Sequence, residues 1–255
     1  RNGGQLIRGV GHDVEQFLPV IGADGVKALK LMGLEAVEIV RRRVEQYAID
    51  CDLRWGYCDL ANKPGDYQGF REDMEELQAL GYRHEMRLVP AAEMRSVVGS
   101  DRYVGGLVDM GSGHLHPLNL CIGEARAAAG LGALIFEHSE VLDIVHGPRP
   151  AVITREGRIE AQQILLAGDV YHKLERRQLK GMIFPAMGGI VTTRPLGELA
   201  REINPQGLAV YDCRFVLDYY RPTADGRLLF GGGANYSGRD SRDIAAELRP
   251  CIERT

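Results

Sequence analysis

The sequence predicts a mixed α+β fold in which a β-rich unit interrupts a doubly wound α/β arrangement. Apolar residues at helical spacing alternate with short β-rich runs as far as Gly130. From Ala133 onward, β-rich runs separated by turn residues predominate. The length of 255 residues suits one large domain or two interleaved domains.

The first half of the chain is expected to alternate between helices and strands. Val26, Leu29 and Val37 lie close to one face of a long amphipathic helix. The expected helices are Gly25–Ile49, Gly65–Gly81, Ala91–Val97 and Pro117–Gly130. The expected strands, which are rich in residues that favour β-structure, are Cys51–Ala61, Glu85–Val89 and Tyr103–Met110.

The second half is expected to be mostly β-structure. The β-rich runs are Ala133–Glu137, Val141–His146, Ala151–Arg155, Gln162–Ala167, Met187–Arg194, Ala209–Phe215, Val216–Pro222 and Arg227–Gly231. Asp225 and Gly226 predict a hairpin turn, because Asp-Gly supplies backbone positions with positive φ. A helix is expected at Asp240–Arg254. Since the chain begins in a glycine loop at Arg1 and stops within this helix, we expect it to be the middle of a longer polypeptide.

Composition and charge exclude several classes of protein. With 45% hydrophobic and 26% charged residues, the chain is neither disordered nor fibrous. A formal net charge of -4 argues against a nucleic-acid partner, because affinity for phosphates comes largely from basic residues. No apolar run approaches the roughly 18 residues that a membrane span needs. The five cysteines form no CxxC pair, so we expect neither a metal site nor a disulfide framework, and we expect a cytoplasmic protein.

Some segments carry candidate binding chemistry, each with a plainer alternative. Arg1, Asn2, Gly3, Gly4 and Gln5 could form either a ligand-binding glycine loop or a surface turn. A small pair, Ala167 and Gly168, closes the run Ala133–Ala167. This pair would allow either close approach of a cofactor or tight packing of a sheet.

Two further segments contain histidine or tyrosine. His114 and His116 lie between an expected strand and an expected helix, where α/β proteins often bind ligands. His116 would make a polar contact at the start of the helix, and no third metal ligand lies at a matching offset. Tyr219 and Arg221 would share one face of a hairpin, facing a cavity or covering the sheet.

In this order, these segments resemble the FAD-dependent D-amino-acid-oxidase-like family, and most of all its bacterial gamma-glutamylputrescine oxidases and related amine oxidases. The resemblance covers essentially the whole chain and implies a Rossmann-like FAD-binding domain interleaved with an antiparallel β-sheet substrate domain. The implied FAD-binding domain is incomplete and comprises residues 1–50, 111–173 and 234–255. The implied substrate domain comprises residues 51–110 and 174–233. The family's initial GxGxxG unit and its C-terminal flavin segment are absent from this sequence.

The resemblance also implies roles for individual residues. The residues that would contact FAD are Arg1, Asn2, Gly3, Gly4, Gln5, Val141, Ala167 and Gly168. Among them, Val141 would touch the adenine through its backbone. Tyr219 would orient the substrate, and His116 would lie near the edge of the cofactor.

The implied activity is oxidation of an amine, either a polyamine derivative such as gamma-glutamylputrescine or an amino acid. Hydride would pass to the flavin, the resulting imine would hydrolyse, and dioxygen or another acceptor would reoxidise the cofactor. No metal is implied, and the protein could form an oligomer. Two alternatives stay open: a flavin dehydrogenase of a hydroxy acid or glycerol phosphate that passes electrons to quinone, and a non-catalytic fragment without flavin.

Overall fold

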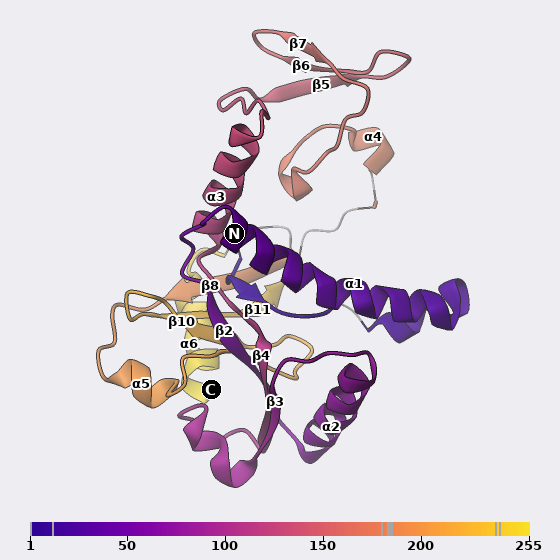
Figure 1. The fold of residues 1–255 in the computed structure, drawn as a ribbon. Helices are drawn as coiled ribbons and strands as arrows, with labels where there is room; N and C mark the ends of the chain where they lie inside the picture. The colour runs from indigo at the N-terminus through magenta and orange to yellow at the C-terminus, as the bar shows by residue number, and fades with distance from the viewer. Residues whose placement is uncertain (1, 12, 180, 183–185, 238, 240) are drawn as a thin grey trace. The chain divides into compact units, whose positions relative to one another are not determined.

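The computed structural model describes residues 2–11, 13–179, 181–182, 186–237, 239 and 241–255. It forms two compact units, which are described separately (Figure 1). Unit 1 consists of Arg1–Ala127, Gly188–Ala234 and Ser241–Thr255, and unit 2 of Ala128–Met187 and Asn235–Asp240. Both contain helices and strands, so the predicted mixed α/β class is confirmed.

Unit 1 is built on an eight-stranded mixed sheet with the order β1-β4-β2-β9-β10-β11-β8, in which β3 also pairs with β4. The strands are β1 (Gln5–Leu6), β2 (Arg54–Ala61), β3 (Met86–Pro90), β4 (Gly105–His114), β8 (Met187–Thr192), β9 (Ala209–Asp212), β10 (Tyr219–Pro222) and β11 (Leu228–Asn235). Strands β2 and β9 pair in parallel, whereas β2 and β4 are antiparallel. The central strands therefore come from both ends of the chain.

One face of this sheet carries the largest apolar core. Side chains alternate between the two faces of a strand, so every second residue of β2, β4, β9, β10 and β11 points into it. The core residues from these strands are Cys58, Leu60, Val108, Val210, Tyr220, Leu228 and Phe230. Met94 of η2 (Ala91–Ser96) and Leu248 of α6 (Ile244–Arg254) belong to the same cluster. Burial of these side chains stabilises the sheet by removing apolar area from water.

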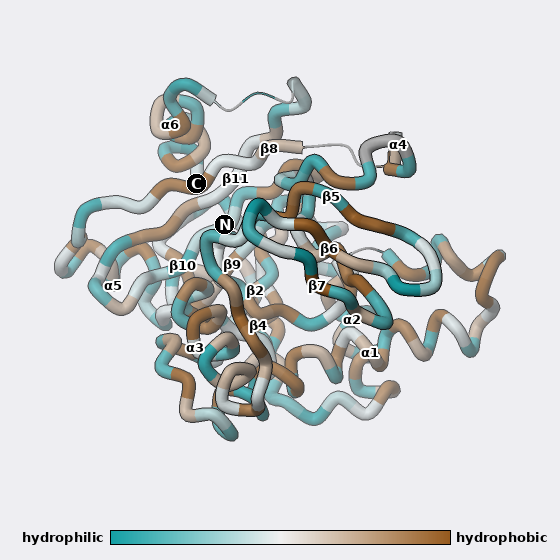
Figure 2. The backbone as a smooth tube through the Cα atoms, turned by 90° about the horizontal axis from the view of Figure 1, so that it is seen from above, coloured by the Kyte–Doolittle hydropathy of each residue, from teal (hydrophilic) through white to brown (hydrophobic). Residues whose placement is uncertain are grey.

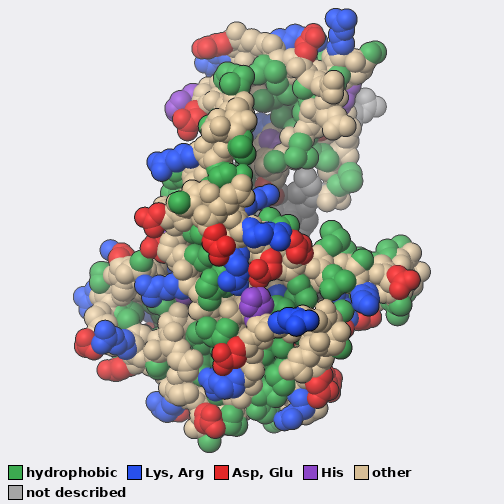
Figure 3. All heavy atoms as spheres, viewed as in Figure 1, with side chains coloured by type: hydrophobic (Ala, Val, Ile, Leu, Met, Phe, Trp, Pro, Cys, Tyr) green, Lys and Arg blue, Asp and Glu red, His purple; other side chains and the backbone are tan. Residues whose placement is uncertain are grey.

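The remaining helices of unit 1 are α1 (Leu18–Gln46), preceded by η1 (Val14–Phe17), then α2 (Pro64–Ala79) and α5 (Leu199–Ile203). Phe70 of α2 packs with Ala61 and Leu107 of the sheet, and Gly81 follows this helix with a φ of +86°. Acidic and basic side chains, red and blue in Figure 3, are interspersed over the surface of unit 1. Within the described residues, none of the helices combines the length and apolar character needed to cross a membrane.

Unit 2 contains a three-stranded antiparallel sheet and little buried surface. Its strands are β5 (Val141–Val145), β6 (Ala151–Thr154) and β7 (Arg158–Glu160). Its short helices are η3 (Asp169–Tyr171) and α4 (Arg176–Leu179), and α3 (Pro117–Gly130) begins in unit 1 and ends in unit 2. Hydrophobic residues, brown in Figure 2, occupy much of β5 and β6. Among its described residues, only Ala151 is fully buried.

Two predicted strands of unit 2 are wrong. Neither Ala133–Glu137 nor Gln162–Ala167 forms a strand, and β7 lies in a segment for which no strand was predicted. Leu134 and Leu165 are 82% and 89% exposed. A buried parallel strand needs neighbours on both edges and cover on both faces. The described residues of unit 2 provide neither neighbouring strands nor cover for Ala133–Glu137 and Gln162–Ala167. These two runs therefore have no strand to pair with.

Candidate active site

A cavity of about 650 Å³ lies in unit 1, on the face of the sheet opposite the apolar core. Its volume falls within the range of ligand pockets for small molecules. Its lining joins the N-terminal segment to the β9–β10 hairpin and consists of Asn2, Gly3, Gly4, Gln5, Ile7, Arg8, Gly9, Val10, Gly11, Asp13, Tyr211, Leu217 and Tyr219. The structure thus brings Asn2, Gly3, Gly4 and Gln5 together with Tyr219. Arg1 lies outside the described residues.

The glycine pair forms a backbone wall that excludes side chains. A Cβ on Gly3 would lie 2.5 Å from Cε2 of Tyr219. Gly4 has a φ of +72°, and a Cβ there would lie 2.2 Å from the carbonyl oxygen of Leu115. The Asn2 side chain accepts a hydrogen bond of 2.9 Å from the Gly4 amide. Glycine is therefore required at both positions, and the loop presents its backbone to the cavity.

Tyr219 and Arg221 of β10 both contact this glycine loop. The Tyr219 ring packs against Gly3, and Arg221 Nε donates a hydrogen bond of 2.5 Å to the Gly3 carbonyl. Arg221 is 5% exposed, and among the described residues no carboxylate forms an ion pair with it. Burial lowers its pKa. The predicted shared face is observed, and it carries a buried positive charge beside the loop.

A polar network lies on the same face of the sheet. Tyr57 and Asp59 alternate with core residues along β2, and Asp109 of β4 lies opposite Tyr57. Arg8 Nη1 donates to Asp109 Oδ2 at 2.6 Å, and Arg8 Nη2 lies 3.5 Å from Asp59 Oδ2. The Tyr57 hydroxyl donates to Asp59 Oδ1 at 2.6 Å. One guanidinium therefore pairs with two buried carboxylates.

Tyr211 connects this network to the cavity. It lies opposite Asp59 on β9, and its ring centroid is 5.3 Å from that of Tyr57. Burial raises the pKa of Tyr211, and the neighbouring Asp59 charge raises it further. Burial likewise raises the pKa of Asp59, against the attraction of Arg8. The shift at Tyr211 keeps its hydroxyl protonated, and the shift at Asp59 makes its carboxylate a stronger proton acceptor than an ordinary aspartate.

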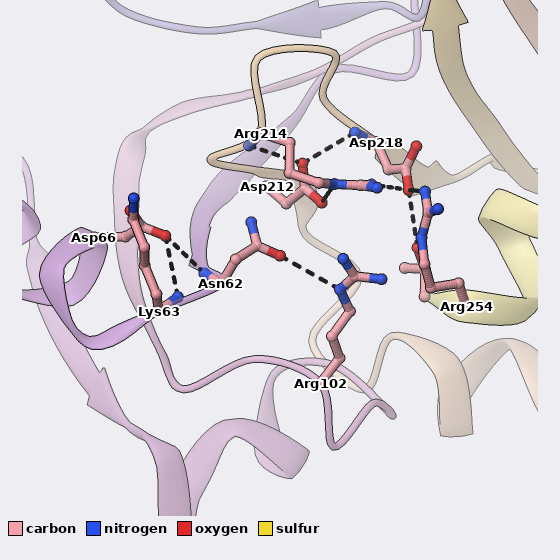
Figure 4. A network of polar contacts seen from close by, with 9 residues as sticks. Asn62, Lys63, Asp66, Arg102, Asp212, Arg214, Asp218 and Arg254 are labelled. Carbon is pink, nitrogen blue, oxygen red and sulfur yellow. Dashed lines mark hydrogen bonds and ion pairs between the residues drawn. The ribbon is translucent and has the colours of Figure 1, made fainter.

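Ion pairs hold the loop between β9 and β10 in place at its base (Figure 4). Arg214 Nε donates to the buried Asp212 at 2.6 Å, and Arg214 also contacts the buried Asp218. Arg254 of α6 reaches Asp218 at 3.2 Å. Asp212 directly follows Tyr211 and Asp218 directly precedes Tyr219. The network therefore fixes the strand ends that carry both cavity tyrosines.

Each candidate histidine makes one hydrogen bond to the backbone outside the cavity, and the buried Nδ1 of His114 has no partner among the described residues. His116 is exposed and does not line the cavity, and its Nδ1 accepts a hydrogen bond of 3.2 Å from the Asn119 amide at the start of α3. The predicted helix-start contact is thus observed. His114 is buried, with Nε2 3.0 Å from the Gly207 carbonyl. Burial lowers its pKa to about 4, which keeps the ring neutral.

The other predicted cofactor residues belong to unit 2. Val141 begins β5 and pairs with Thr154, whereas Ala167 and Gly168 are exposed. Gly168 precedes the short helix η3. These residues belong to a different unit from the cavity, and their cofactor role stays a prediction.

Sequence reasoning missed Arg8, Asp59, Asp109 and Tyr211. A signal was present in β2, where Tyr57 and Asp59 alternate with the apolar residues Cys58 and Leu60. This alternation places Tyr57 and Asp59 on one face. Charged groups are rarely buried unless they are paired, so a buried partner was to be expected. The partner Arg8 is far away in sequence and could not be identified from the pattern.

The comparisons with known proteins agree with this architecture. Residues 1–255 match the family described as FAD dependent oxidoreductase. The chain is 38% identical to gamma-glutamylputrescine oxidoreductase of Escherichia coli (strain K12), over 100% of the chain and 60% of that protein. It is 36% identical to the probable oxidoreductase OrdL of Haemophilus influenzae, over 98% of the chain and 58% of that protein.

Among solved structures, glycine oxidase from Geobacillus kaustophilus matches with a TM-score of 0.67 and 19% identity, over 89% of this chain and 62% of that one. The chain belongs to the FAD-dependent oxidoreductase family that includes the D-amino-acid oxidases. FAD is the cofactor of this family. The chain spans about 60% of the length of the curated relatives it matches.

Proposed function

We propose that this chain supplies the amine-binding part of an oxidoreductase that oxidises a polyamine derivative such as gamma-glutamylputrescine. The observation that carries the proposal is the cavity that joins the glycine loop at Gly3 and Gly4 to Tyr211 and Tyr219. The identity with gamma-glutamylputrescine oxidoreductase supports this substrate class. An amino acid is the second substrate class compatible with the same reaction.

The residues around the cavity fit the isoalloxazine end of FAD. Gly3 and Gly4 line the cavity without side chains of their own, and Tyr219 and Arg221 fill the space where their Cβ atoms would lie. A flat ring could therefore lie against this backbone and the Tyr219 ring. The buried guanidinium of Arg221 beside this wall would favour negative charge on the reduced ring. We propose that Asn2 and Gln5 complete this wall and that Arg1 also contacts FAD. Val141, Ala167 and Gly168 would contact the dinucleotide.

The functional division of the chain follows from this proposal. Residues 1–50, 111–173 and 234–255 would contribute to FAD binding, and residues 51–110 and 174–233 to substrate binding. This is a division by role, and it differs from the two compact units, which are defined by contacts within the chain.

FAD, when bound, supplies the hydride acceptor for oxidation of a carbon–nitrogen bond. The chain's own residues would orient and enclose the substrate. Tyr219 would hold the amine against the glycine wall, and the polar network beneath Tyr211 would favour a cationic group in the cavity. His116 stays a candidate at the cofactor edge. Dioxygen or another acceptor would remove the electrons.

The test uses the full-length protein with its flavin. Under anaerobic conditions, gamma-glutamylputrescine should bleach the flavin absorbance, whereas glycerol phosphate and 2-hydroxy acids should not. Peroxide formation in air, compared with reduction of a quinone analogue, then distinguishes an oxidase from a dehydrogenase. A colourless protein that does not take up added FAD, or bleaching by glycerol phosphate alone, would contradict the proposal.

A cytoplasmic location is proposed on the free state of all five cysteines, Cys51, Cys58, Cys121, Cys213 and Cys251. Fractionation of cells that express the full-length protein tests it. A role in polyamine breakdown is likewise proposed from the similarity to gamma-glutamylputrescine oxidoreductase.

A further inference from the structure

The two buried carboxylates of the polar network, Asp59 and Asp109, differ in the hydrogen bonds that they accept. Asp109 accepts hydrogen bonds from Arg8 at 2.6 Å, from the Tyr82 hydroxyl at 2.7 Å and from the Gly111 amide at 2.9 Å. Asp59 accepts from the Tyr57 hydroxyl at 2.6 Å, but its Oδ2 lies 3.5 Å from Arg8. Arg8 thus neutralises Asp109 more than Asp59. Asp59 is the carboxylate that is better able to take up a proton.

Tyr211 is placed to carry that proton from the cavity. Its backbone lies opposite Asp59 on the neighbouring parallel strand. Its side chain interacts electrostatically with Asp59 and Tyr57, its ring centroid lies 5.3 Å from that of Tyr57, and it lines the cavity beside Tyr219. Asp59 itself is 6% exposed and does not line the cavity. A group bound in the cavity can therefore reach Asp59 only through a neighbour such as Tyr211.

We propose that Asp59 accepts, through the Tyr211 hydroxyl, the proton that an ammonium substrate loses in the cavity. The proton on the substrate nitrogen passes to Tyr211 Oη while the Tyr211 hydroxyl proton passes to Asp59. The nitrogen keeps its electron pair, so an ammonium ion and a carboxylate become a neutral amine and a carboxylic acid. This inference rests on the proposed function, because it concerns an amine in the same cavity.

Hydride leaves the carbon readily when the neighbouring nitrogen has a free electron pair to donate. An ammonium nitrogen has no such pair, so the reaction needs a group that accepts its proton. An alkylammonium ion has a pKa of about 10, like that of lysine, so only about one molecule in a thousand is neutral at pH 7. A positioned proton acceptor typically contributes about 10²–10⁴-fold to such a rate.

Several other titratable or charged groups interact electrostatically with Asp59 and influence its proton affinity. They come from the segment after β1, from β2, α2, β4 and β9, and from the loop after β9, and they are Arg8, Tyr57, Asp73, Asp109, Tyr211 and Cys213. Burial raises the pKa of Asp59 most strongly, and Asp109 raises it further, whereas Arg8 opposes both. Because Arg8 opposes the effects of burial and Asp109 on its pKa, the protonated Asp59 can release its proton again once the product has left.

The test measures anaerobic reduction of the flavin by gamma-glutamylputrescine in the full-length holoenzyme, from about pH 6 to about pH 10. Asp59→Asn keeps the shape and the hydrogen bond from Tyr57 but cannot accept a proton. We expect it to slow reduction about 100-fold at pH 7 and only a few-fold near pH 10, where the substrate is itself neutral. Asp59→Glu should restore part of the rate at pH 7.

Tyr211→Phe removes the relay without removing the acid, and it should show the same recovery at high pH. Tyr220→Phe is the matched control, since this neighbouring tyrosine faces the apolar core, and its rate should not change. An Asp59→Asn or Tyr211→Phe protein that reduces flavin normally at pH 7 would overturn the relay, as would equal slowing at every pH. If the unmodified enzyme fails to reduce flavin at any pH, the proposed function itself is wrong.

Discussion

The two faces of the eight-stranded sheet differ in chemistry, although the same strands form both. Along β2, Cys58 and Leu60 point into the apolar core, whereas Tyr57 and Asp59 point to the opposite, polar face. Neighbouring residues of one strand therefore have different roles, because one stabilises the apolar core and the next faces the candidate active site. Mutations on the apolar face should change stability most, and mutations on the polar face should change activity most.

The largest expected effect is on the apolar face. Phe230→Ala should lower the free energy of unfolding by about 4 kcal/mol, because it leaves a cavity in the core where Phe230 is 1% exposed. Tyr219→Phe on the polar face is the comparison, and it should change stability by less than about 1 kcal/mol while impairing turnover. Urea denaturation of the full-length protein measures both. Equal destabilisation by the two changes would contradict the division between faces.

A smaller effect is expected at the glycine wall. Gly4→Ala should destabilise the protein by about 3 kcal/mol, because its φ is positive and its Cβ would overlap the Leu115 carbonyl. Gly11 lines the same cavity with a φ of +81°, but nothing lies within 4 Å of its Cβ position. Gly11→Ala should therefore change stability by only about 1 kcal/mol. Thermal unfolding and flavin content measure the difference, and indistinguishable variants would show that packing against Leu115 is unimportant.

The buried His114 should make stability depend on pH. Its pKa is about 4 in the folded chain, against 6.5 ordinarily, so only the unfolded chain takes up this proton between those values. The free energy of unfolding should be highest above pH 6.5 and fall by about 3 kcal/mol as the pH decreases to about 4. Denaturation curves at several pH values measure the slope. His114→Gln should remove the contribution of His114 to the pH dependence of the free energy of unfolding. If the slope is unchanged in this variant, other groups cause the pH dependence.

The smallest effect is expected at the surface, away from both faces. Arg95 and Asp101 form an ion pair in which the side chains are 67% and 74% exposed. Arg95→Ala should change the free energy of unfolding by less than about 1 kcal/mol, and addition of salt should reduce the difference further. A larger loss in urea denaturation would mean that the pair is part of a network.

Local sequence patterns predicted most elements of unit 1. The expected helices at Gly25–Ile49 and Gly65–Gly81 correspond to α1 and α2. The Asp-Gly turn joins β10 to β11, with Gly226 at a φ of +76°. These patterns succeed because helix periodicity and turn chemistry depend on residues within a few positions of one another.

Local patterns failed where pairing decides the outcome. The apolar runs at Ala133–Glu137 and Gln162–Ala167 have strand composition but form no strand. A strand exists only when a neighbour satisfies its backbone groups, and that neighbour need not be close in sequence.

By itself, the sequence determined the fold class, most helices and turns, and the resemblance to a flavoprotein family, since all of these depend on local spacing and the order of motifs. Only the tertiary structure decided which of its residues share a cavity. Gly3 and Arg221 are 218 positions apart and yet are joined by a hydrogen bond. Asp59 and Tyr211 meet because β2 and β9 pair in parallel. Contacts of this kind follow from sheet order and register, which the local sequence of neither strand specifies.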